Sequence, residues 1–359
     1  MNLYHASTQW ATRPIDERFQ DLVTMYTVTK AYADAARERA VPWPDLRVEA
    51  RNDEVVLIGK ANVPARFSHY AFGQVAQRIG APVSYLRTLP ATLAAQNLNH
   101  GFKERADGTA CLLFHRPDSD DALPILRAAT TEKYARIWDH EVIARLIDLS
   151  AQANLIPARQ TFAWDGGKFT ANDVSLYASD HDMFAFLMSP DRDITGPNGE
   201  TLRRGVIVTN SEVGDKRLTV MGFMFRDVCA NHIIWGAEKL AEVSLVHVGE
   251  IRQRWLDAQV RVRRYLDGPA SFTQASFAQW TARIADSKEG VLDTLFGKRL
   301  GTQKVLAASW DAVQPEQDGD PRTVWGFAQG MTRYSQAQSY ADTRTDLDRA
   351  AGRLLSMDF

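Results

Sequence analysis

The sequence has little cysteine and no long apolar run. Its 359 residues include two cysteines, Cys111 and Cys229, whose wide separation matches no zinc-binding spacing. We therefore expect both thiols to be small buried side chains in a reducing compartment, outside any disulfide framework. No stretch approaches the roughly 18–20 apolar residues that span a bilayer, and residues 1–13 lack the apolar core of a signal peptide. These absences predict a cytoplasmic protein without a membrane segment.

The common catalytic motifs are absent as well. The chain has no phosphate-binding loop, no dinucleotide-binding glycine fingerprint, no nucleophile elbow and no zinc-protease motif. The sequence therefore predicts no catalytic residue, no metal site and no cofactor. It leaves open whether the protein is an enzyme, and a non-catalytic role is favoured. The net charge of −2 is low for a protein that coats DNA, which must neutralise many phosphates, although a local basic groove is compatible with it.

The rest of the composition is typical of a globular mixed fold. Hydrophobic residues make up 45% and charged residues 24%, which is enough to bury a core. The β-branched run at 54–58 predicts a strand, and apolar residues spaced three to four apart after residue 250 predict helices. We expect an α+β fold with a mixed, mainly antiparallel sheet core, packed helices and a helical C-terminal third. The expected parts are an N-terminal helical and polar segment (1–45), an α+β core domain (46–250) and a helical region packed on that core (251–359).

One segment resembles the helix-turn-helix motif of DNA-binding proteins. In residues 72–86, Ala76, Gly80 and Leu86 occupy the positions of the helix crossing, the turn glycine and an apolar residue of the second helix. The second helix is short and nearly uncharged, however, and Pro90 ends it. Groove-reading helices present polar or basic side chains, so an ordinary helical hairpin is favoured.

A second candidate is an arginine-rich helix over residues 250–266. Basic groups with nearby aromatic rings suit single-stranded nucleic acid, because charge neutralises its backbone and rings stack on its bases. At about 100° per residue, however, the arginines flank the apolar face on both sides, as they do when their stems cover a core edge. A solvated face is favoured, and a binding surface is the alternative. The residues are Arg252, Arg254, Arg261, Arg263 and Arg264, with Trp255 and Tyr265.

A third candidate is a group of polar residues at the ends of the predicted central strands, which could contact phosphate or carboxylate groups. Cys229 with His232 would suggest a thiol nucleophile, but no third group orients the base, so a structural thiol is favoured. Asp180, His181 and Asp182 carry metal-ligand atoms, yet neighbours on a strand point to opposite faces, so a turn is favoured over a metal site. The polar cluster is Asn210, Ser211, Arg226, Cys229, Asn231 and His232, with Arg203, Arg204, Lys216 and Arg217 nearby in the sequence.

These central motifs resemble the phage/plasmid-like protein family, a domain-of-unknown-function family of phages, prophages and conjugative plasmids. The resemblance rests on the Asn210-Ser211 pair and the Arg-x-x-Cys-x-Asn block at 226–231, and it extends from about residue 50 to 340. It implies an accessory protein of a mobile element. The further matches are Gly80, Pro82, Tyr85 and Leu86, then Leu126, Arg127, Ala128, Tyr134 and Asp139, and finally Trp325, Gly326, Thr332 and Tyr334.

Three functions are open at this point. The favoured one is non-catalytic binding of nucleic acid, single-stranded rather than duplex, through phosphate contacts. The second is binding to a host or element-encoded protein, such as a host defence factor, through an exposed aromatic hot spot. The third is an enzyme of unrecognised type that uses Arg226, Cys229 and His232 in a pocket. The oligomeric state is not predicted. The expected phosphate-binding residues are Arg203, Arg204, Lys216, Arg217, Arg226, Arg261, Arg263 and Arg264, with Asn210 and Asn231 offering hydrogen bonds to bases or sugars.

Overall fold

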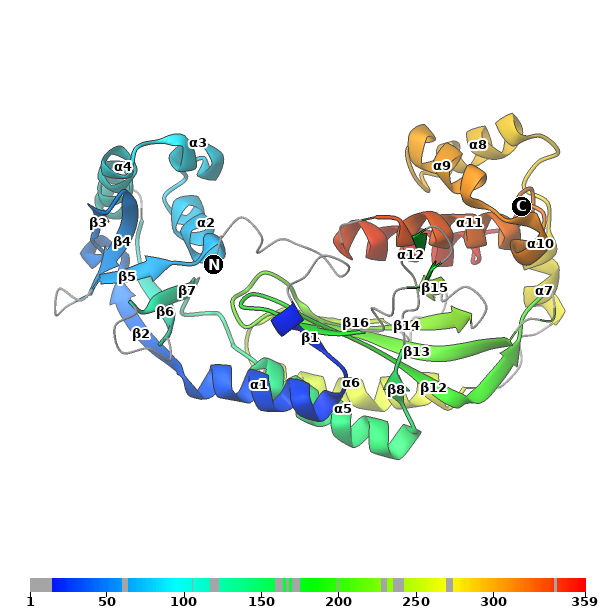
Figure 1. Cartoon of the computed structure of the whole chain (residues 1–359), viewed down its shortest axis with the longest axis horizontal. Coiled ribbons are helices and arrows are strands. Elements are labelled where there is room, and N and C mark those ends of the chain that lie inside the picture. The colour runs from blue at the N-terminus through cyan, green and yellow to red at the C-terminus, as the bar shows by residue number, and fades with distance from the viewer. Residues whose placement is uncertain are drawn as a thin grey trace.

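A computed structural model of the chain contains two large sheets, each covered by helices (Figure 1). The structure describes residues 15–359 except 60–63, 105, 117–122, 159–163, 166–167, 170–174, 198, 200, 227–230, 235–241, 269–273 and 339–340. Of Arg226, Asn231 and His232 it describes the backbone alone, and Cys229 lies outside the described residues. The predicted α+β class and the helical C-terminal region are confirmed, with most of the strands divided between the two sheets.

The first sheet, called the N-terminal sheet, has the strand order β2-β6-β7-β5-β4-β3. Its neighbours are antiparallel except β5 and β7, which run parallel. A parallel pair needs a crossover connection, and three helices and β6 lie between these two strands in the chain. The strands are β2 (Ala36–Pro42), β3 (Val48–Arg51), β4 (Glu54–Ile58), β5 (Pro64–Phe67), β6 (Thr109–His115) and β7 (Ile125–Thr131), and the helices are η3 (Trp43–Asp45), α2 (His69–Arg78), α3 (Val83–Thr88) and α4 (Ala91–Glu104).

The second sheet, called the C-terminal sheet, has the order β1-β11-β12-β13-β14-β15, with β16 also paired to β14 and β8 to β12. All these pairs are antiparallel. The strands are β1 (Arg18–Phe19), β8 (Ile156–Pro157), β11 (Leu176–Ala178), β12 (Met183–Thr195), β13 (Thr201–Asn210), β14 (Leu218–Arg226), β15 (Asn231–Ile234) and β16 (Glu242–Leu245). A short separate hairpin pairs β9 (Trp164–Asp165) with β10 (Lys168–Phe169).

Helices cover both faces of the C-terminal sheet (Figure 1). On one face, α1 (Leu22–Asp34), α5 (Asp139–Ala153) and α6 (Ile251–Leu266) bury a core with the strands. Over the other face lie α11 (Val324–Gln336) and α12 (Ala341–Leu354), which pack on β15. No described helix is both long and apolar enough to cross a bilayer. The remaining elements are η2 (Ile15–Glu17), α7 (Gln274–Thr281), α8 (Lys288–Gly297), α9 (Gln303–Ala312) and α10 (Pro315–Asp318).

The first two strands of the described chain, β1 and β2, belong to different sheets. β1 pairs with β11 of the C-terminal sheet, and α1 then leads across to β2, which pairs with β6 of the N-terminal sheet. The Asp21 side chain starts α1 by accepting a hydrogen bond from the Thr24 amide at 2.7 Å, which satisfies one of the unpaired donors of the first turn. The N-terminal sheet is therefore inserted in the chain between the first strand of the C-terminal sheet and the rest of it.

Candidate functional site: a cationic cleft between the two sheets

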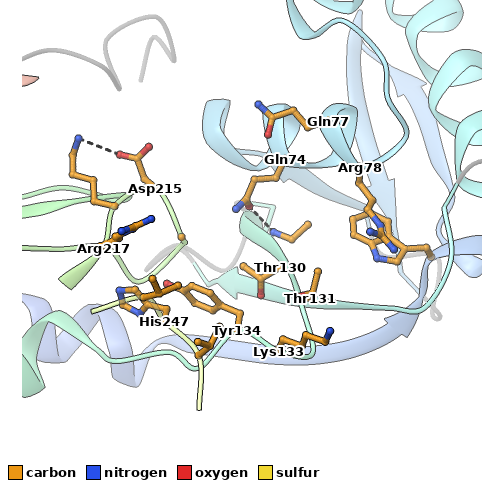
Figure 2. Close-up of a pocket in the computed structure, with 16 residues that line it drawn as sticks. Gln74, Gln77, Arg78, Thr130, Thr131, Lys133, Tyr134, Asp215, Arg217 and His247 are labelled. Carbon is orange, nitrogen blue, oxygen red and sulfur yellow. Dashed lines mark hydrogen bonds and ion pairs between the residues drawn. The ribbon is translucent and has the colours of Figure 1, made fainter. Parts of the chain in front are cut away.

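A cleft of about 630 Å³ opens where the N-terminal sheet meets one end of the C-terminal sheet (Figure 2). The N-terminal side of its wall comes from η3, from α2 and from the end of β7 with the loop that follows it. The other side comes from the loop between β13 and β14 and from the segment after β16. The lining residues are Trp43, Gln74, Gln77, Arg78, Ala129, Thr130, Thr131, Lys133, Tyr134, Gly214, Asp215, Lys216, Arg217, Val246, His247 and Val248.

The cleft is lined by four basic side chains and one acidic side chain. Arg78 and Lys133 belong to the N-terminal side, and Lys216 and Arg217 to the C-terminal side, with Asp215 as the acidic group. Because the two sides contribute two cations each, the positive charge surrounds the cleft. A concave site lined by one sign of charge concentrates oppositely charged ligands.

Two of the cations are held in place and two are exposed. The Arg78 guanidinium donates to the Asp107 carboxylate at 2.7 Å and lies 5.7 Å from the ring centre of Trp43. The Lys216 ammonium lies 3.7 Å from the Asp215 carboxylate. Lys133 and Arg217 are exposed to solvent, so their charged ends can reach a ligand in the cleft.

Gln74 joins the walls of the cleft to one another. Its side-chain nitrogen donates to the Val213 carbonyl at 2.8 Å, and its side-chain oxygen accepts from the Ala129 amide at 2.8 Å. One side chain of α2 thus contacts both β7 and the β13–β14 loop. Since buried backbone groups are costly to leave unpaired, this bridge fixes the spacing of the walls.

The floor of the cleft contains a stacked aromatic pair. The rings of Tyr134 and His247 lie 5.1 Å apart at 15°. The Tyr134 hydroxyl donates to the Ser211 carbonyl at 2.8 Å, and His247 Nδ1 lies 3.2 Å from the Ala135 carbonyl. Burial lowers the pKa of His247 to about 4, so this ring is neutral at pH 7 and adds no charge to the cleft.

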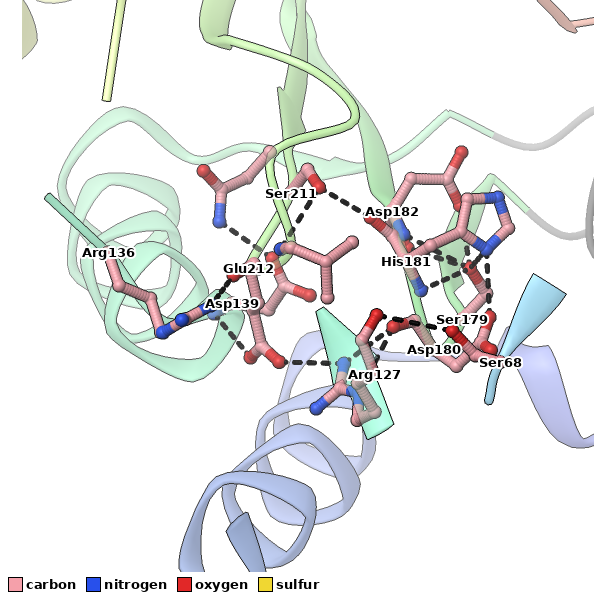
Figure 3. A network of polar contacts seen from close by, with 12 residues as sticks. Ser68, Arg127, Arg136, Asp139, Ser179, Asp180, His181, Asp182, Ser211 and Glu212 are labelled. Carbon is pink, nitrogen blue, oxygen red and sulfur yellow. Dashed lines mark hydrogen bonds and ion pairs between the residues drawn. The ribbon is translucent and has the colours of Figure 1, made fainter. Parts of the chain in front are cut away.

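Behind the cleft a buried ion pair links the two sheets (Figure 3). Arg127 of β7 and Glu212 of the β13–β14 loop are both 3% exposed and lie 2.9 Å apart. The Arg127 guanidinium also donates to the Asp180 carbonyl at 2.7 Å. Arg136 contacts Glu212 as well, through its carbonyl oxygen. The pair therefore holds the β13–β14 loop and the β11–β12 turn against the N-terminal sheet.

Asn210 and Ser211, the Asn-Ser pair of the sequence motif, are structural in this network. The Asn210 amide donates to the Asp139 carboxyl at 2.7 Å and to the Ile137 carbonyl at 3.1 Å. Both Asn210 and Ser211 are fully buried, so neither reaches a ligand in the cleft. Burial, with the nearby Glu212 charge, raises the pKa of Asp139 well above its usual range. A proton retained by Asp139 reduces the repulsion between the two adjacent carboxyl groups.

The turn over Asp180, His181 and Asp182 connects β11 to β12, as the sequence predicted. His181 Nδ1 lies 2.8 Å from the Asp180 carboxylate. Burial alone would lower the pKa of His181, but its contacts with Asp180 and Asp182 outweigh burial and raise it. Neighbouring residues on a strand point to opposite faces, but these three lie in a turn, and their side chains are therefore close to one another.

The expected phosphate-binding residues lie in separate places. Lys216 and Arg217 line the cleft, whereas Arg203 and Arg204 lie at the opposite end of β13. Six residues of strand separate Arg204 from Asn210, which is about 20 Å. Arg204 is buried, donates to the Gly268 carbonyl at 3.0 Å and packs over Tyr265. Successive strand residues face opposite sides, so Arg203 points away from Arg204.

The arginines of α6 are also remote from the cleft. α6 begins close to the cleft, next to His247, and Arg261 lies ten residues further on, about 15 Å along the axis. Arg263 is engaged with Asp267 at 3.2 Å and with Gln152 at 2.9 Å. Arg261 and Arg264 are exposed. Their distance from the cleft makes them a separate surface.

The enzyme hypothesis depends on residues that lie outside the described part of the chain. These are the side chains of Arg226, Asn231 and His232 and the whole of Cys229.

The segment that resembles a helix-turn-helix forms α2 and α3, and α3 has six residues. Arg87 near its end donates to the His69 carbonyl at 2.9 Å. It is α2, by way of Gln74, Gln77 and Arg78, that meets the cleft.

Two cationic residues of the cleft, Arg78 and Lys133, were not among the expected binding residues. Arg78 lies inside the segment that resembles a helix-turn-helix, so the sequence indicates the segment but does not distinguish this side chain. Nothing in the sequence around Lys133 marks it, because its role depends on a loop more than 80 residues later in the chain. Both become part of one site only when the two sheets meet.

The family model for a domain of unknown function, DUF932, matches residues 157–357, which is more than half of the chain. The match covers β11 to β16 of the C-terminal sheet and the helices that follow. The motif matches before residue 157 lie outside it. No curated protein and no solved structure matches the chain. The predicted membership of a family of unknown function is thereby confirmed, and the chain belongs to the DUF932 family.

Proposed function

We propose that the protein binds nucleic acid, single-stranded rather than duplex, in the cationic cleft and without catalysis. The observation that carries the proposal is the placing of Arg78, Lys133, Lys216 and Arg217 around one cleft with a single carboxylate, Asp215. Phosphates are the recurrent anions of a nucleic acid strand, and lysine and arginine contacts to them supply most sequence-independent affinity.

The shape of the site favours a single strand. Proteins read a duplex by inserting a protruding helix or β-ribbon into a groove, whereas this site is concave. Gln77 and Thr131 lie exposed on its wall and supply hydrogen-bonding groups for sugars or base edges. The ring of Trp43 is 1% exposed and is covered by Arg78, so it adds little base stacking. The proposed binding is therefore mainly electrostatic and tolerant of sequence.

The resemblance to the phage/plasmid-like family supports a wider proposal. We propose that the protein is an accessory factor of a phage or plasmid and acts in the cytoplasm of the host cell. Single-stranded intermediates arise when such elements replicate and transfer, and a cleft with charge on both walls suits a flexible strand.

The test is fluorescence anisotropy of a labelled single-stranded oligonucleotide and its duplex over a salt series. For four phosphate contacts the logarithm of the binding constant falls with a slope of about −2.8 against the logarithm of salt concentration. Affinity should then drop about 50-fold between 50 and 200 mM salt. Binding that is absent at low salt, or insensitive to salt, contradicts the proposal.

A pair of double variants locates the binding. Lys133→Gln with Arg217→Gln removes two exposed cations from the cleft and should make the salt slope less steep by about 1.4. Arg261→Gln with Arg264→Gln removes the same charge from α6, about 15 Å or more away, and should leave the slope unchanged. An equal loss in the two variants would show that net charge, and not the cleft, determines affinity.

A second candidate function is binding to another protein, which exposed apolar side chains on α6 favour. Leu256 and Val260 are 42% and 58% exposed, and residues four apart share one helix face. Cross-linking of the protein in host extract should yield a partner that is no longer cross-linked when both residues are substituted with serine. Oligonucleotide binding should stay intact in that variant. Retention of every cross-linked partner by that variant counts against this candidate.

A further inference from the structure

Three metal-ligand side chains meet at the end of the C-terminal sheet that faces the N-terminal sheet. They are His181 and Asp182 of the β11–β12 turn and Asp215 of the β13–β14 loop, and their ligand atoms all lie within 4.8 Å of one another. The two turns share this end because Met183 of β12 pairs with Asn210 of β13. The sequence could not bring Asp215 to the others, since more than 30 residues separate them.

The two turns are tied together at this point. The Ser211 hydroxyl donates to the His181 carbonyl at 2.6 Å and accepts from the Asp215 amide at 2.9 Å. This fixes the backbone of two of the three residues relative to each other. A site whose backbone is already in place loses less conformational freedom when it binds an ion.

The imidazole of His181 is oriented as in metal-binding histidines. Its Nδ1 is 2.8 Å from the carboxylate of Asp180, which is not one of the three. Its Nε2 is the atom directed toward Asp182, at 3.7 Å from Oδ1. Histidine ligands of metals almost always contact a carboxylate or carbonyl through the other ring nitrogen, which fixes the tautomer and the ring plane. The ring of Tyr70 stacks against His181 at 6.4 Å and 22°.

The surroundings carry an excess of negative charge. Asp180, Asp182 and Asp215 cluster around His181. The cations near them are Lys216, at 3.7 Å from Asp215, and Arg127, which donates to the Asp180 carbonyl. The side chain of Asp182 is 4% exposed and that of His181 is 11% exposed. The Asp182 carboxylate is largely removed from water, where opposite charge nearby offsets the cost of burial, and a dication would add such charge.

We propose that His181, Asp182 and Asp215 bind a divalent transition-metal ion, Mn²⁺ or Zn²⁺. Carboxylate oxygens suit Mn²⁺ and imidazole suits the later divalent metals, so one nitrogen with two oxygens selects Mn²⁺ or Zn²⁺ over Ca²⁺. Three protein ligands leave further coordination positions for water or a ligand. Asp215 also lines the cleft, so the ion would lie at the cleft wall and add positive charge there.

The test is a titration of the full chain with MnCl₂ in the absence of oligonucleotide. Electron paramagnetic resonance of free Mn²⁺ and calorimetry measure how much of the ion is bound. One ion per chain is expected. Asp215→Asn should abolish binding, and because Asp215 is exposed the variant should fold. Asp180→Asn, which replaces the carboxylate beside His181 Nδ1 with a neutral amide, should weaken binding about 10- to 100-fold.

Asp257→Asn is the matched control, since it removes an exposed carboxylate from α6 and should leave the affinity unchanged. Zn²⁺ binding with the same dependence on Asp215 also supports the proposal. No binding of either ion, or binding that Asp215→Asn leaves intact, overturns it. Because these titrations contain no nucleic acid, their outcome is separate from that of the function proposed above.

Discussion

The buried pair between Arg127 and Glu212 makes a quantitative prediction about how the two sheets are held together. Removing one member of a buried ion pair leaves the other charge without a partner in a medium of low polarity, which costs about 3–5 kcal/mol. Arg127→Met should have this effect, because Glu212 then remains buried beside Asp139, whose pKa its charge already helps to raise. Arg127 and Glu212 are each 3% exposed, so water cannot replace the lost contact.

Glu212→Gln should cost less than Arg127→Met. Without the Glu212 charge, Asp139 is relieved of a repulsion that adds to burial in raising its pKa, and the Arg127 guanidinium keeps its hydrogen bond to the Asp180 carbonyl. The double variant should recover part of the loss of Arg127→Met, because it removes both buried charges together. The asymmetry between the two single variants follows from the third carboxyl group.

The assay is urea-induced unfolding of the purified variants, with the free energy of unfolding taken by linear extrapolation. Arg145→Met is the matched control, because Arg145 and Asp148 form an exposed pair at 3.4 Å, which is worth no more than about 1 kcal/mol. If Arg127→Met stays within about 1 kcal/mol of the unsubstituted protein, the argument that this pair joins the two sheets fails.

Two further predictions concern other parts of the fold. Burial lowers the pKa of His247 to about 4 from about 6.5 in the unfolded chain, so its contribution to stability is complete above pH 6.5. This contribution should be lost as the pH falls toward 4, by about 3 kcal/mol in all. The free energy of unfolding in urea at pH 7 and pH 5 should therefore depend less on pH for His247→Gln than for the unsubstituted protein. An equal pH dependence of the two proteins would contradict this reasoning. Gly326→Ala places a methyl group against the Asp320 backbone and should lower stability by about 1–3 kcal/mol. Gly297→Ala meets no neighbouring atom and should not, so equal melting temperatures for the two variants would refute the packing argument.

Local features of the fold could be predicted because they depend on nearby residues. Ser68 caps α2 by accepting from the Ala71 amide at 3.0 Å. The apolar spacing after residue 250 yields α6, whose residues Trp255 and Val262 are buried in the core. Such caps and periodicities act within one or two helical turns, so the sequence shows them directly.

The cleft could not be predicted, because it depends on how two sheets meet. Arg78 and Arg217 are far apart in the chain, and contacts between the two sheets, such as those of Gln74 and Arg127, bring them to one cleft. Clustering in the sequence was misleading for the same reason. Arg204 and Arg217 each stand in a basic pair, yet one is buried over Tyr265 and the other is exposed.

The insertion of the N-terminal sheet after β1 has a consequence for synthesis on the ribosome. Arg18 of β1 pairs with Tyr177 of β11, so the first strand must wait until residue 177 has been made. At about 5–20 residues per second this delay is about 8–30 s. The N-terminal sheet, whose strands end at Thr131, can fold during that interval. During that interval the nascent chain therefore exposes the apolar face of α1 that later packs on α5 and β11.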